Sequence, residues 1–295
     1  MNRVLITGIT GYIGSHLARK LLPEYEVYGL VREPLNKAYI EDIFSQIHFV
    51  YYDGTYDSMD AALEACRPDL VYHLATYYTG SHSAEHIRKL LDSNIGMGLH
   101  LLEAMSEHAV PALVYASTVM AHYQGEAYRP LNLYAATKQA FSDLLAYYTD
   151  AGLLRAVTLV ISDTYGPGDR RPKVLNLIRD AAQKKEPMAL SRGNQDYDVV
   201  YIDDVVRAFQ LAGEQLLAGQ MQGGTFQIVP EFPLTLRETV EKMLQLHGSF
   251  WQGDWGARPP AQREILRAVR VYPTLPDWKP AVSLEEGLRS LEWDC

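Results

Sequence analysis

The feature that most constrains this fold is an alternation of short apolar runs with helical patterns along the first half of the chain. Val4 to Thr7 is apolar, and apolar residues then recur at helical spacing from Ile13 to Leu22. The later runs are EVYGLV, IHFVYY, DLVYHLA, ALVYAS and LRAVTLVI, with helical stretches near 39–44, at MDAALEAC, and over 84–108 and 133–149. Such alternation predicts an α/β fold with a doubly wound parallel sheet, because right-handed crossovers place helices on both faces.

The turn between the first strand and the first helix contains three glycines in the spacing G-x-x-G-x-x-G. Gly8 would permit a tight turn, Gly11 would let the backbone approach a pyrophosphate, and Gly14 would let the helix pack closely on the strand. The N–H groups and the dipole at the helix start favour phosphates. A ligand-free turn would collect glycines too, but the strand–helix context favours a dinucleotide site.

Composition limits the possible partners. The chain has 295 residues and a formal net charge of −9, whereas a nucleic-acid surface needs a basic face. No apolar run is long enough to span a bilayer, and no signal-peptide pattern precedes the first strand. Cys66 and Cys295 are far apart, which suits a reducing compartment better than a disulfide framework. We therefore expect a cytoplasmic protein with no nucleic-acid or membrane partner.

The end of the second strand, VYGLVREP, bears on the choice of dinucleotide. A carboxylate there would accept a hydrogen bond from the ribose 2′-OH and would repel a 2′-phosphate. This chain instead places Arg32 after Leu30 and Val31, with Glu33 one step later. An arginine can stack on adenine and pair with a 2′-phosphate. We expect NADP(H), with NAD(H) as the alternative if Arg32 is only a solvated charge.

A candidate catalytic pair follows the fifth apolar run. Tyr134 and Lys138 are four residues apart, so they share one face of a helix. A lysine ammonium near a phenol lowers the pKa of the phenol, which could then give or take a proton at a carbonyl or alcohol oxygen. Thr118, at the end of the preceding strand, could hydrogen-bond the same oxygen. Most Y-x-x-x-K pairs lie on helix surfaces, but the Ser-Thr strand end before this one favours an active site.

With these motifs the chain resembles the extended short-chain dehydrogenase/reductase family, which includes nucleotide-sugar epimerases, dehydratases and ketoreductases. The resemblance runs over nearly the whole chain, through TGITGYIG, YYDGTYD, VYHLAT, DSNIGMGLHLLEA, YGPGD, DYDVVYIDDVVRAF and WKPAVSLEEGLRSLEW. It implies a Rossmann-type domain with a substrate-capping lobe and a Thr–Tyr–Lys active site. It also implies adenine contact by Asp53, and a homodimer that pairs the helix of Tyr134 with the helix over 94–108.

The pattern changes after Tyr165, where Pro and Gly become frequent and helices such as 174–184 and 236–245 are separated by loops. RPPAQRE and YPTLPDWKP look irregular. We therefore expect a dinucleotide-binding Rossmann domain over 1–164 plus about 199–229. A smaller, mixed substrate-binding lobe would comprise 165–198 and 230–295.

Departures from the family pattern narrow the reaction. Val119 and Met120 follow Thr118, whereas family dehydratases have an Asp-Glu pair there that moves protons during loss of water. No cysteine lies near the site to form the Cys/His pair of reductases that also epimerise. The Thr–Tyr–Lys set alone suffices for carbonyl reduction or for epimerisation at a hydroxyl carbon.

Two further departures concern the substrate. Asp163 stands where the family has an asparagine, and Tyr197 stands where it has an arginine, both of which often touch the nucleotide diphosphate. A carboxylate repels phosphate, and a phenol offers fewer donors than a guanidinium. Basic residues of the same region are candidates to compensate: Arg170, Arg171, Lys173 and Arg192.

The predicted site residues fall into three groups. The catalytic residues are Thr118, Tyr134 and Lys138. The residues expected at the dinucleotide are Gly8, Thr10, Gly11, Tyr12, Ile13, Gly14, Arg32, Asp53, Gly54, Leu74, Ala75, Thr76, Ser117, Tyr134, Lys138 and Ile161. Those expected at the substrate are Tyr78, Ser81, His122, Tyr123, Asp163, Lys173 and Arg192. No metal site is predicted.

The leading functional interpretation is NADPH-dependent reduction of a keto group on a 4-keto-deoxy nucleotide sugar, with the proton coming from Tyr134. One alternative is a nucleotide-sugar 4-epimerase with tightly bound NAD. Another is a non-catalytic nucleotide-binding protein, against which the intact set of Thr118, Tyr134 and Lys138 argues.

Overall fold

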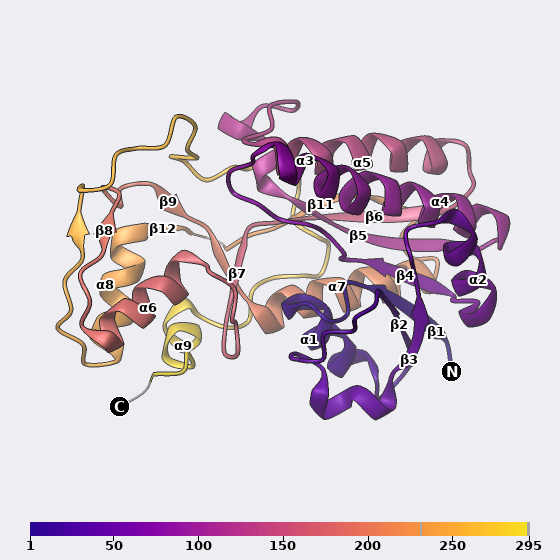
Figure 1. Cartoon of the computed structure of the whole chain (residues 1–295), viewed down its shortest axis with the longest axis horizontal. Helices are drawn as coiled ribbons and strands as arrows, with labels where there is room; N and C mark the ends of the chain where they lie inside the picture. The colour runs from indigo at the N-terminus through magenta and orange to yellow at the C-terminus, as the bar shows by residue number, and fades with distance from the viewer. Residues whose placement is uncertain (231, 294–295) are drawn as a thin grey trace.

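The fold is built on one parallel sheet. The computed structural model describes residues 1–230 and 232–293, and its main sheet has seven strands in the order β11-β6-β5-β4-β1-β2-β3 (Figure 1). These strands are β1 Arg3–Thr7, β2 Glu26–Val31, β3 His48–Tyr51, β4 Leu70–His73, β5 Ala112–Thr118, β6 Arg155–Ile161 and β11 Gly224–Ile228. The strand order reverses direction between β1 and β4, and ligands of open parallel sheets bind at such a switch point. The predicted α/β, Rossmann-type fold is confirmed.

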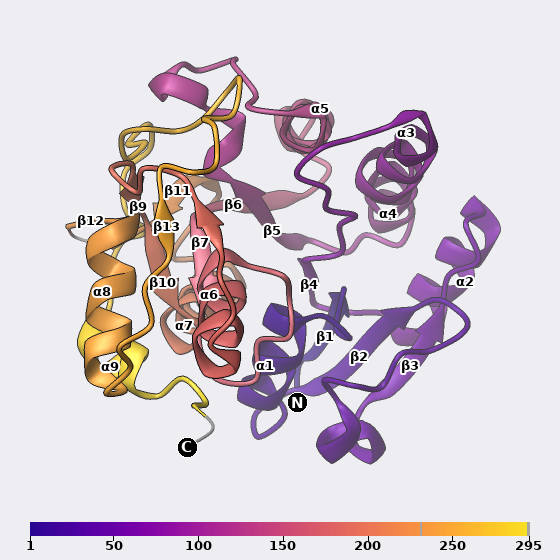
Figure 2. The same ribbon diagram turned by 60° about the vertical axis from the view of Figure 1, so that its left-hand side comes forward.

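Helices cover both faces of the sheet, as the alternation of the sequence predicts. α1 (Tyr12–Leu21) and α7 (Ile202–Leu217) lie on one face, and α2 (Tyr56–Cys66), α4 (Met97–Glu107) and α5 (Leu133–Asp150) lie on the other (Figure 2). Two separate apolar cores result. Leu17 and Phe209 belong to the first, and Leu101 and Phe141 belong to the second. Every residue of β5 is buried, because this strand is central and covered on both faces.

Two predicted helices take a different form. The stretch over 84–108 is α3 (Ala84–Leu91), a π-helical turn η2 (Asp92–Gly96) and then α4. The π turn carries Asn94 and is of the kind often found at functional sites. The stretch near 39–44 is a 3₁₀ helix, η1 (Glu41–Gln46), that buries only Ile43. Its two apolar residues, Ile43 and Phe44, are adjacent and do not form a stripe at helical spacing that would support a longer α-helix.

The remaining elements form a smaller lobe with its own apolar core, which includes Leu175, Ile178 and Val240. Its helices α6 and α8 match the predicted ranges 174–184 and 236–245 closely, and RPPAQRE contains no regular element. The helices are α6 Val174–Lys184, α8 Leu236–Leu246 and α9 Leu284–Arg289, and the paired strands are β9 Asp196–Tyr197 with β12 Leu234–Thr235, and β8 Ala189–Leu190 with β13 Asp254–Trp255. A further pair, β7 Asp163–Tyr165 with β10 Val199–Tyr201, lies where the chain passes between the main sheet and this lobe.

Cys66 is a buried free thiol on α2, and Cys295 lies outside the described residues. None of the described helices combines the length and apolar character needed to cross a membrane. Two short 3₁₀ helices, η3 (Val119–Ala121) and η4 (Tyr123–Gly125), connect β5 to α5. They place the start of α5 beside the end of β5, where the predicted catalytic residues lie.

Candidate active site

The glycine turn has the geometry that a dinucleotide pyrophosphate needs. Gly8 has a φ of +75°, in the left-handed region that favours glycine. A Cβ on Gly14 would lie 2.2 Å from the Gly8 carbonyl oxygen, so only glycine lets α1 approach the turn this closely. Gly11 caps the N-terminus of α1 without a side-chain hydrogen bond. The helix start is therefore open to an anionic group.

This turn opens into a large cavity at the carboxyl ends of the sheet strands. Its volume is about 860 Å³, and its walls come from the sheet, from α5 and from the second lobe. The structure brings eighteen of the predicted site residues to these walls: Gly8, Thr10, Gly11, Tyr12, Ile13, Gly14, Arg32, Leu74, Ala75, Thr76, Tyr78, Ser117, Thr118, Tyr134, Lys138, Ile161, Asp163 and Lys173. A cavity of this size is in the range of sites that enclose a small organic ligand.

The three predicted catalytic residues meet at this cavity. Tyr134 and Lys138 lie in the first turns of α5, and the Asn132 side chain caps this helix by accepting from the Ala135 N–H at 2.9 Å. Thr118 ends β5, and its hydroxyl accepts a hydrogen bond from the backbone N–H of Met120 at 3.2 Å. All three catalytic candidates are buried.

Burial controls the protonation of this pair. It raises the pKa of Tyr134; a hydrogen bond with Thr76 lowers that pKa, and the nearby Tyr78 and Asp163 raise it. Burial also lowers the pKa of Lys138 to about 7. The spacing predicts that the Lys138 ammonium lowers the Tyr134 pKa, but in the structure loss of hydration disfavours both charged forms. Tyr134 therefore carries its proton at neutral pH, as a proton donor must.

Asn94 on the π turn holds the wall beside Tyr134. Its Oδ1 accepts from the Thr76 hydroxyl at 3.1 Å and from the Tyr77 N–H at 2.7 Å. Its Nδ2 donates to the Thr137 hydroxyl at 2.9 Å, which links the wall to α5. With its amide oxygen and nitrogen both engaged in the protein, Asn94 fixes the shape of the site.

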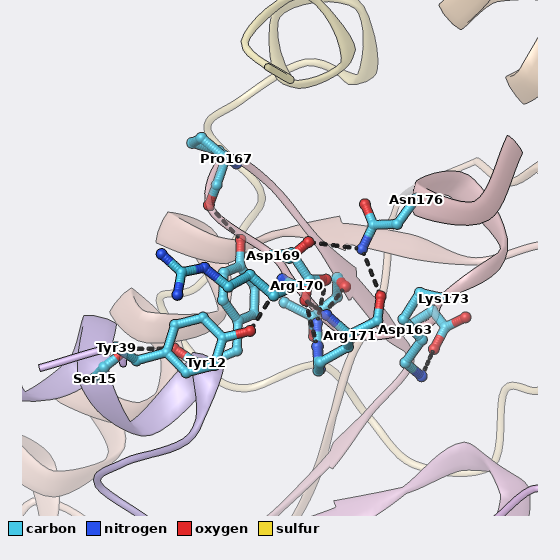
Figure 3. A network of polar contacts seen from close by, with 11 residues as sticks. Tyr12, Ser15, Tyr39, Asp163, Pro167, Asp169, Arg170, Arg171, Lys173 and Asn176 are labelled. Atoms are coloured by element: carbon cyan, nitrogen blue, oxygen red, sulfur yellow. Dashed lines mark hydrogen bonds and ion pairs between the residues drawn. The ribbon is translucent and has the colours of Figure 1, made fainter. Parts of the chain in front are cut away.

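Near Tyr134, the cavity wall contains an ion pair. The Lys173 ammonium lies 2.7 Å from Oδ1 of Asp163 (Figure 3), and it lies 5.0 Å from the centroid of the Tyr78 ring. The Tyr78 ring in turn meets the Tyr134 ring edge-on at 4.9 Å. Asp163 therefore serves to hold a lysine in the cavity wall, which offsets the negative charge that this aspartate brings.

A second ion pair, between Arg171 and Asp169, links the start of α1 to the loop before α6. Arg171 donates to Asp169 at 2.7 and 2.8 Å and to the Thr164 carbonyl at 2.8 Å. Its guanidinium lies 4.6 Å from the ring of Tyr12 on α1, and the Tyr12 hydroxyl donates to the Pro167 carbonyl at 3.1 Å (Figure 3). The dinucleotide turn and the loop that leads to Lys173 are thus held in one arrangement.

At the other end of the cavity, the exposed Arg32 and the buried Tyr52 form the wall. Asp53 is adjacent, but its carboxylate accepts from the Thr55 hydroxyl at 2.6 Å and from the Thr55 N–H at 2.9 Å. These hydrogen bonds lower the Asp53 pKa to about 2. Asp53 thus supports the start of α2.

Six predicted residues do not line the cavity. His122 is buried against Tyr272, and the Tyr123 ring faces Arg129 and Arg263. These two side chains contact the partners named and do not reach the cavity, which the same loop lines with Val119, Met120 and Leu131. The other four are exposed and lie outside the cavity walls: Asp53, Gly54, Ser81 and Arg192.

One segment of the cavity wall was not predicted from the sequence. Glu264, Ile265, Ala268 and Val269 line the cavity, although they lie in the irregular stretch after α8. This segment is held by Asp196, which accepts from the Ala268 N–H at 2.8 Å. No periodicity marks such residues in the sequence, because the contacts that place them are long-range.

Comparison with known proteins agrees with this geometry. The model of the NAD dependent epimerase/dehydratase family matches residues 4–228. CDP-abequose synthase of Yersinia pseudotuberculosis is 28% identical over 242 residues, covering 81% of this chain and 82% of that protein. A probable UDP-glucuronate 4-epimerase of Rhizobium meliloti is 26% identical over 337 residues, covering 99% and 96%.

Solved structures of similar fold also include nucleotide-sugar epimerases. The UDP-glucose 4-epimerase of Thermus thermophilus, in complex with NAD, superimposes with a TM-score of 0.83 at 28% identity, covering 98% of this chain and 97% of that one. Together with the family match over most of the sequence, this confirms the resemblance drawn from the motifs. The chain belongs to the NAD dependent epimerase/dehydratase family.

Proposed function

We propose that this protein catalyses a nicotinamide-dependent oxidation or reduction at the C4 position of a nucleotide-linked sugar. The observation that carries the proposal is the meeting of Thr118, Tyr134 and Lys138 in one cavity that begins at the glycine turn. A binding protein would have no use for a buried lysine with a pKa of about 7 beside a buried phenol. The names of the relatives refer to CDP-, UDP- and dTDP-linked sugars.

Three residues of the chain have separate roles at the sugar. Tyr134, protonated at neutral pH, gives its proton to the oxygen at C4 when the carbonyl is reduced, and takes one back in the reverse direction. Thr118 donates a hydrogen bond to the same oxygen, and Lys138 supplies positive charge beside Tyr134. When bound, the nicotinamide cofactor supplies or accepts the hydride.

The cofactor would rest on the glycine turn and pass along the sheet edge. The backbone at Gly8 and Gly11 would meet its phosphates, and Gly14 would keep α1 close to that turn, since a side chain on Gly14 would collide with the Gly8 carbonyl. Arg32 and Tyr52 would flank the adenosine end. We propose NADP(H), because Arg32 directly follows β2, at the position where a carboxylate would favour NAD(H). The NAD named with the Thermus thermophilus enzyme supports the alternative.

Two forms of the reaction fit this site. Epimerisation is supported by the names of several relatives, which act as 4-epimerases. Reduction of a 4-keto sugar is supported by Arg32, because NADP(H) suits a cofactor that is exchanged at each turnover. The relatives support epimerisation at least as well as reduction, and both forms use the same Thr118, Tyr134 and Lys138.

One experiment distinguishes the two forms. The protein is purified, denatured, and the released small molecules are identified by mass spectrometry. Stoichiometric NAD would support the epimerase, in which the cofactor stays bound, whereas a protein free of cofactor that consumes NADPH with a 4-keto nucleotide sugar would be a reductase. The absence of turnover with any nucleotide sugar, at saturating cofactor, would refute both.

We further propose that the substrate binds between Tyr78, Asp163 and Lys173, with Lys173 facing its anionic part. We propose that residues 1–164 with about 199–229 form the dinucleotide-binding domain, and that 165–198 with 230–295 form the substrate-binding lobe. The separate apolar core of the second lobe supports this division.

We also propose a homodimer that pairs α5, the helix of Tyr134, with the helix over 94–108, which includes α4. Large apolar side chains are exposed on these helices and on α3: Ile87, Leu91, Leu99 and Tyr147. Light scattering at micromolar concentration tests this proposal, and the mass of a single chain would refute it.

A further inference from the structure

We propose that Tyr115 is a positioning residue for Lys138, whose ammonium is held at the cavity wall by the face of the Tyr115 ring. The Lys138 Nζ lies 4.3 Å from the ring centroid. Tyr115 is fully buried on β5, three residues before Thr118, and does not line the cavity. The proposal rests on the proposed function, in which Lys138 acts beside Tyr134.

The ammonium of Lys138 depends on this ring for its stability. Burial lowers the pKa of Lys138, and no carboxylate among the described residues offsets that effect. The face of an aromatic ring carries partial negative charge and attracts a cation, most strongly where water is excluded. Tyr115 therefore supplies the attraction that a buried ammonium without a counter-ion needs.

The Tyr115 ring is itself fixed on its other sides. Its hydroxyl donates to the Lys138 carbonyl oxygen at 3.2 Å, which ties the ring to the backbone of the residue it supports. His73, its register partner on β4, stacks on it at 5.8 Å, and the Phe141 ring meets it edge-on at 4.6 Å. With neighbours on these sides, the ring has little freedom to turn away from Lys138.

His73 does not compete for the position. Burial, with the nearby charge of Lys138, lowers the His73 pKa to about 3, so this imidazole is neutral. Its Nδ1 lies 2.8 Å from the Thr7 hydroxyl, which itself accepts from the Ala75 N–H. His73 is thus not the group that attracts the ammonium, and the contact with the face of the Tyr115 ring sets both the place and the charge of the lysine.

The test measures the titration of Lys138 directly in the cofactor-free protein. Because Lys138 lines the cavity, acetic anhydride can reach its amine, and mass spectrometry of the Lys138 peptide at a series of pH values gives the midpoint of its titration. The variants are Tyr115→Met, which fills the space without a ring, and Tyr115→Phe, which keeps the ring. Tyr72→Met is the matched control, since Tyr72 is equally buried on the neighbouring strand β4 but packs in the other core.

We expect Tyr115→Met to lower the midpoint by about one pH unit, the scale of a desolvated cation–π contact. Tyr115→Phe and Tyr72→Met should titrate as the wild type does. Should Tyr115→Met fail to fold, incorporation of pentafluorophenylalanine in place of Tyr115 keeps the ring shape and reverses its charge distribution, and it should lower the midpoint in the same way.

Three outcomes would overturn the proposal: an unchanged midpoint in a folded Tyr115→Met protein, an equal decrease in Tyr115→Phe, or an equal decrease in Tyr72→Met. The labelling needs no substrate, so it is independent of turnover. A lowered midpoint without any activity on nucleotide sugars would leave the Tyr115 contact standing and refute the proposed function. Activity on a nucleotide sugar, together with an unchanged Lys138 midpoint in Tyr115→Met, would support the proposed function and refute the role of Tyr115.

Discussion

Arg171 holds the buried carboxylate of Asp169 with two hydrogen bonds, of 2.7 and 2.8 Å, and rests its guanidinium on the ring of Tyr12. Asp169 is 3% exposed, so water cannot replace the arginine. The pair thus joins the start of α1 to the loop that carries Lys173 (Figure 3).

Arg171→Ala should therefore destabilise the protein by about 3–5 kcal/mol, because it leaves a buried charge without its partner. Urea denaturation measures the loss. Arg289→Ala is the control: Arg289 pairs with Glu285 in an exposed i,i+4 contact, and its loss should cost less than about 1 kcal/mol. Equal losses in the two variants would contradict the role of burial.

Tyr134→Phe should keep the fold and the affinity for cofactor, since the ring and its packing survive. Turnover should fall by roughly 10²–10⁴-fold, the scale of one positioned acid–base group. Lys138→Ala should be at least as damaging, and Thr118→Val should cost about 10- to 100-fold, as expected for one hydrogen bond to the reacting oxygen.

Steady-state kinetics on a 4-keto nucleotide sugar or an epimerisable one, with cofactor titration as the control, measures this order. Activity retained in Tyr134→Phe would show that another group is the acid. Loss of cofactor binding in that variant would mean that the tyrosine acts on the fold and not on the chemistry.

Gly14→Ala should weaken dinucleotide binding and destabilise the protein by about 1–3 kcal/mol, because the new Cβ would collide with the Gly8 carbonyl and push α1 outward. Gly96→Ala is a suitable control, since its Cβ would meet nothing closer than the Leu91 carbonyl at 3.6 Å. Fluorescence titration with NAD(P)H and thermal melting provide the two readouts. Unchanged affinity in Gly14→Ala would place the phosphates elsewhere.

The stability of the cofactor-free protein should rise with pH between about 7 and 9. The pKa of Lys138 is about 7 in the folded state, whereas an unfolded lysine titrates near 10.4. In this window the unfolded state binds more protons, so raising the pH favours the folded state by at most about 1.4 kcal/mol per pH unit.

Urea midpoints at pH 7, 8 and 9 measure the rise, and Lys138→Met should remove it. From about pH 8.5 upward the Cys66 thiol opposes this rise, because burial raises the pKa of the folded thiol to about 12 and the unfolded thiol, with a pKa of about 8.5, ionises first. A rise of the same size in Lys138→Met would assign it to other groups.

Arg32→Ala should weaken NADPH binding by about 1.5–3 kcal/mol, the range of a charge-assisted hydrogen bond, with exposure favouring the lower end. NADH binding should hardly change. Equilibrium titration with both cofactors makes the comparison, and similar losses for the two would exclude pairing with a 2′-phosphate.

The sequence by itself determined the layered α/β fold. Apolar runs of strand length, separated by helices with one apolar stripe, can be buried only as parallel strands between two helical layers. It also determined the turn at Gly8 and Gly14 and the common helix face of Tyr134 and Lys138, because these depend on spacing over a few residues. These local relationships do not depend on how the rest of the chain packs.

Only the tertiary structure decided which residues complete the cavity wall and which protonation states the residues of the site have. Lys173 meets Asp163 across a loop, Glu264 reaches the cavity from an irregular segment, and Tyr115 lies under Lys138 from a different element. Contacts between residues of different elements or loops produce no periodic pattern in the sequence, so the sequence alone does not predict them. The pKa values follow the same rule. Spacing predicts that Lys138 lowers the pKa of Tyr134, whereas burial, which depends on everything packed around the pair, raises the pKa of Tyr134 and lowers that of Lys138.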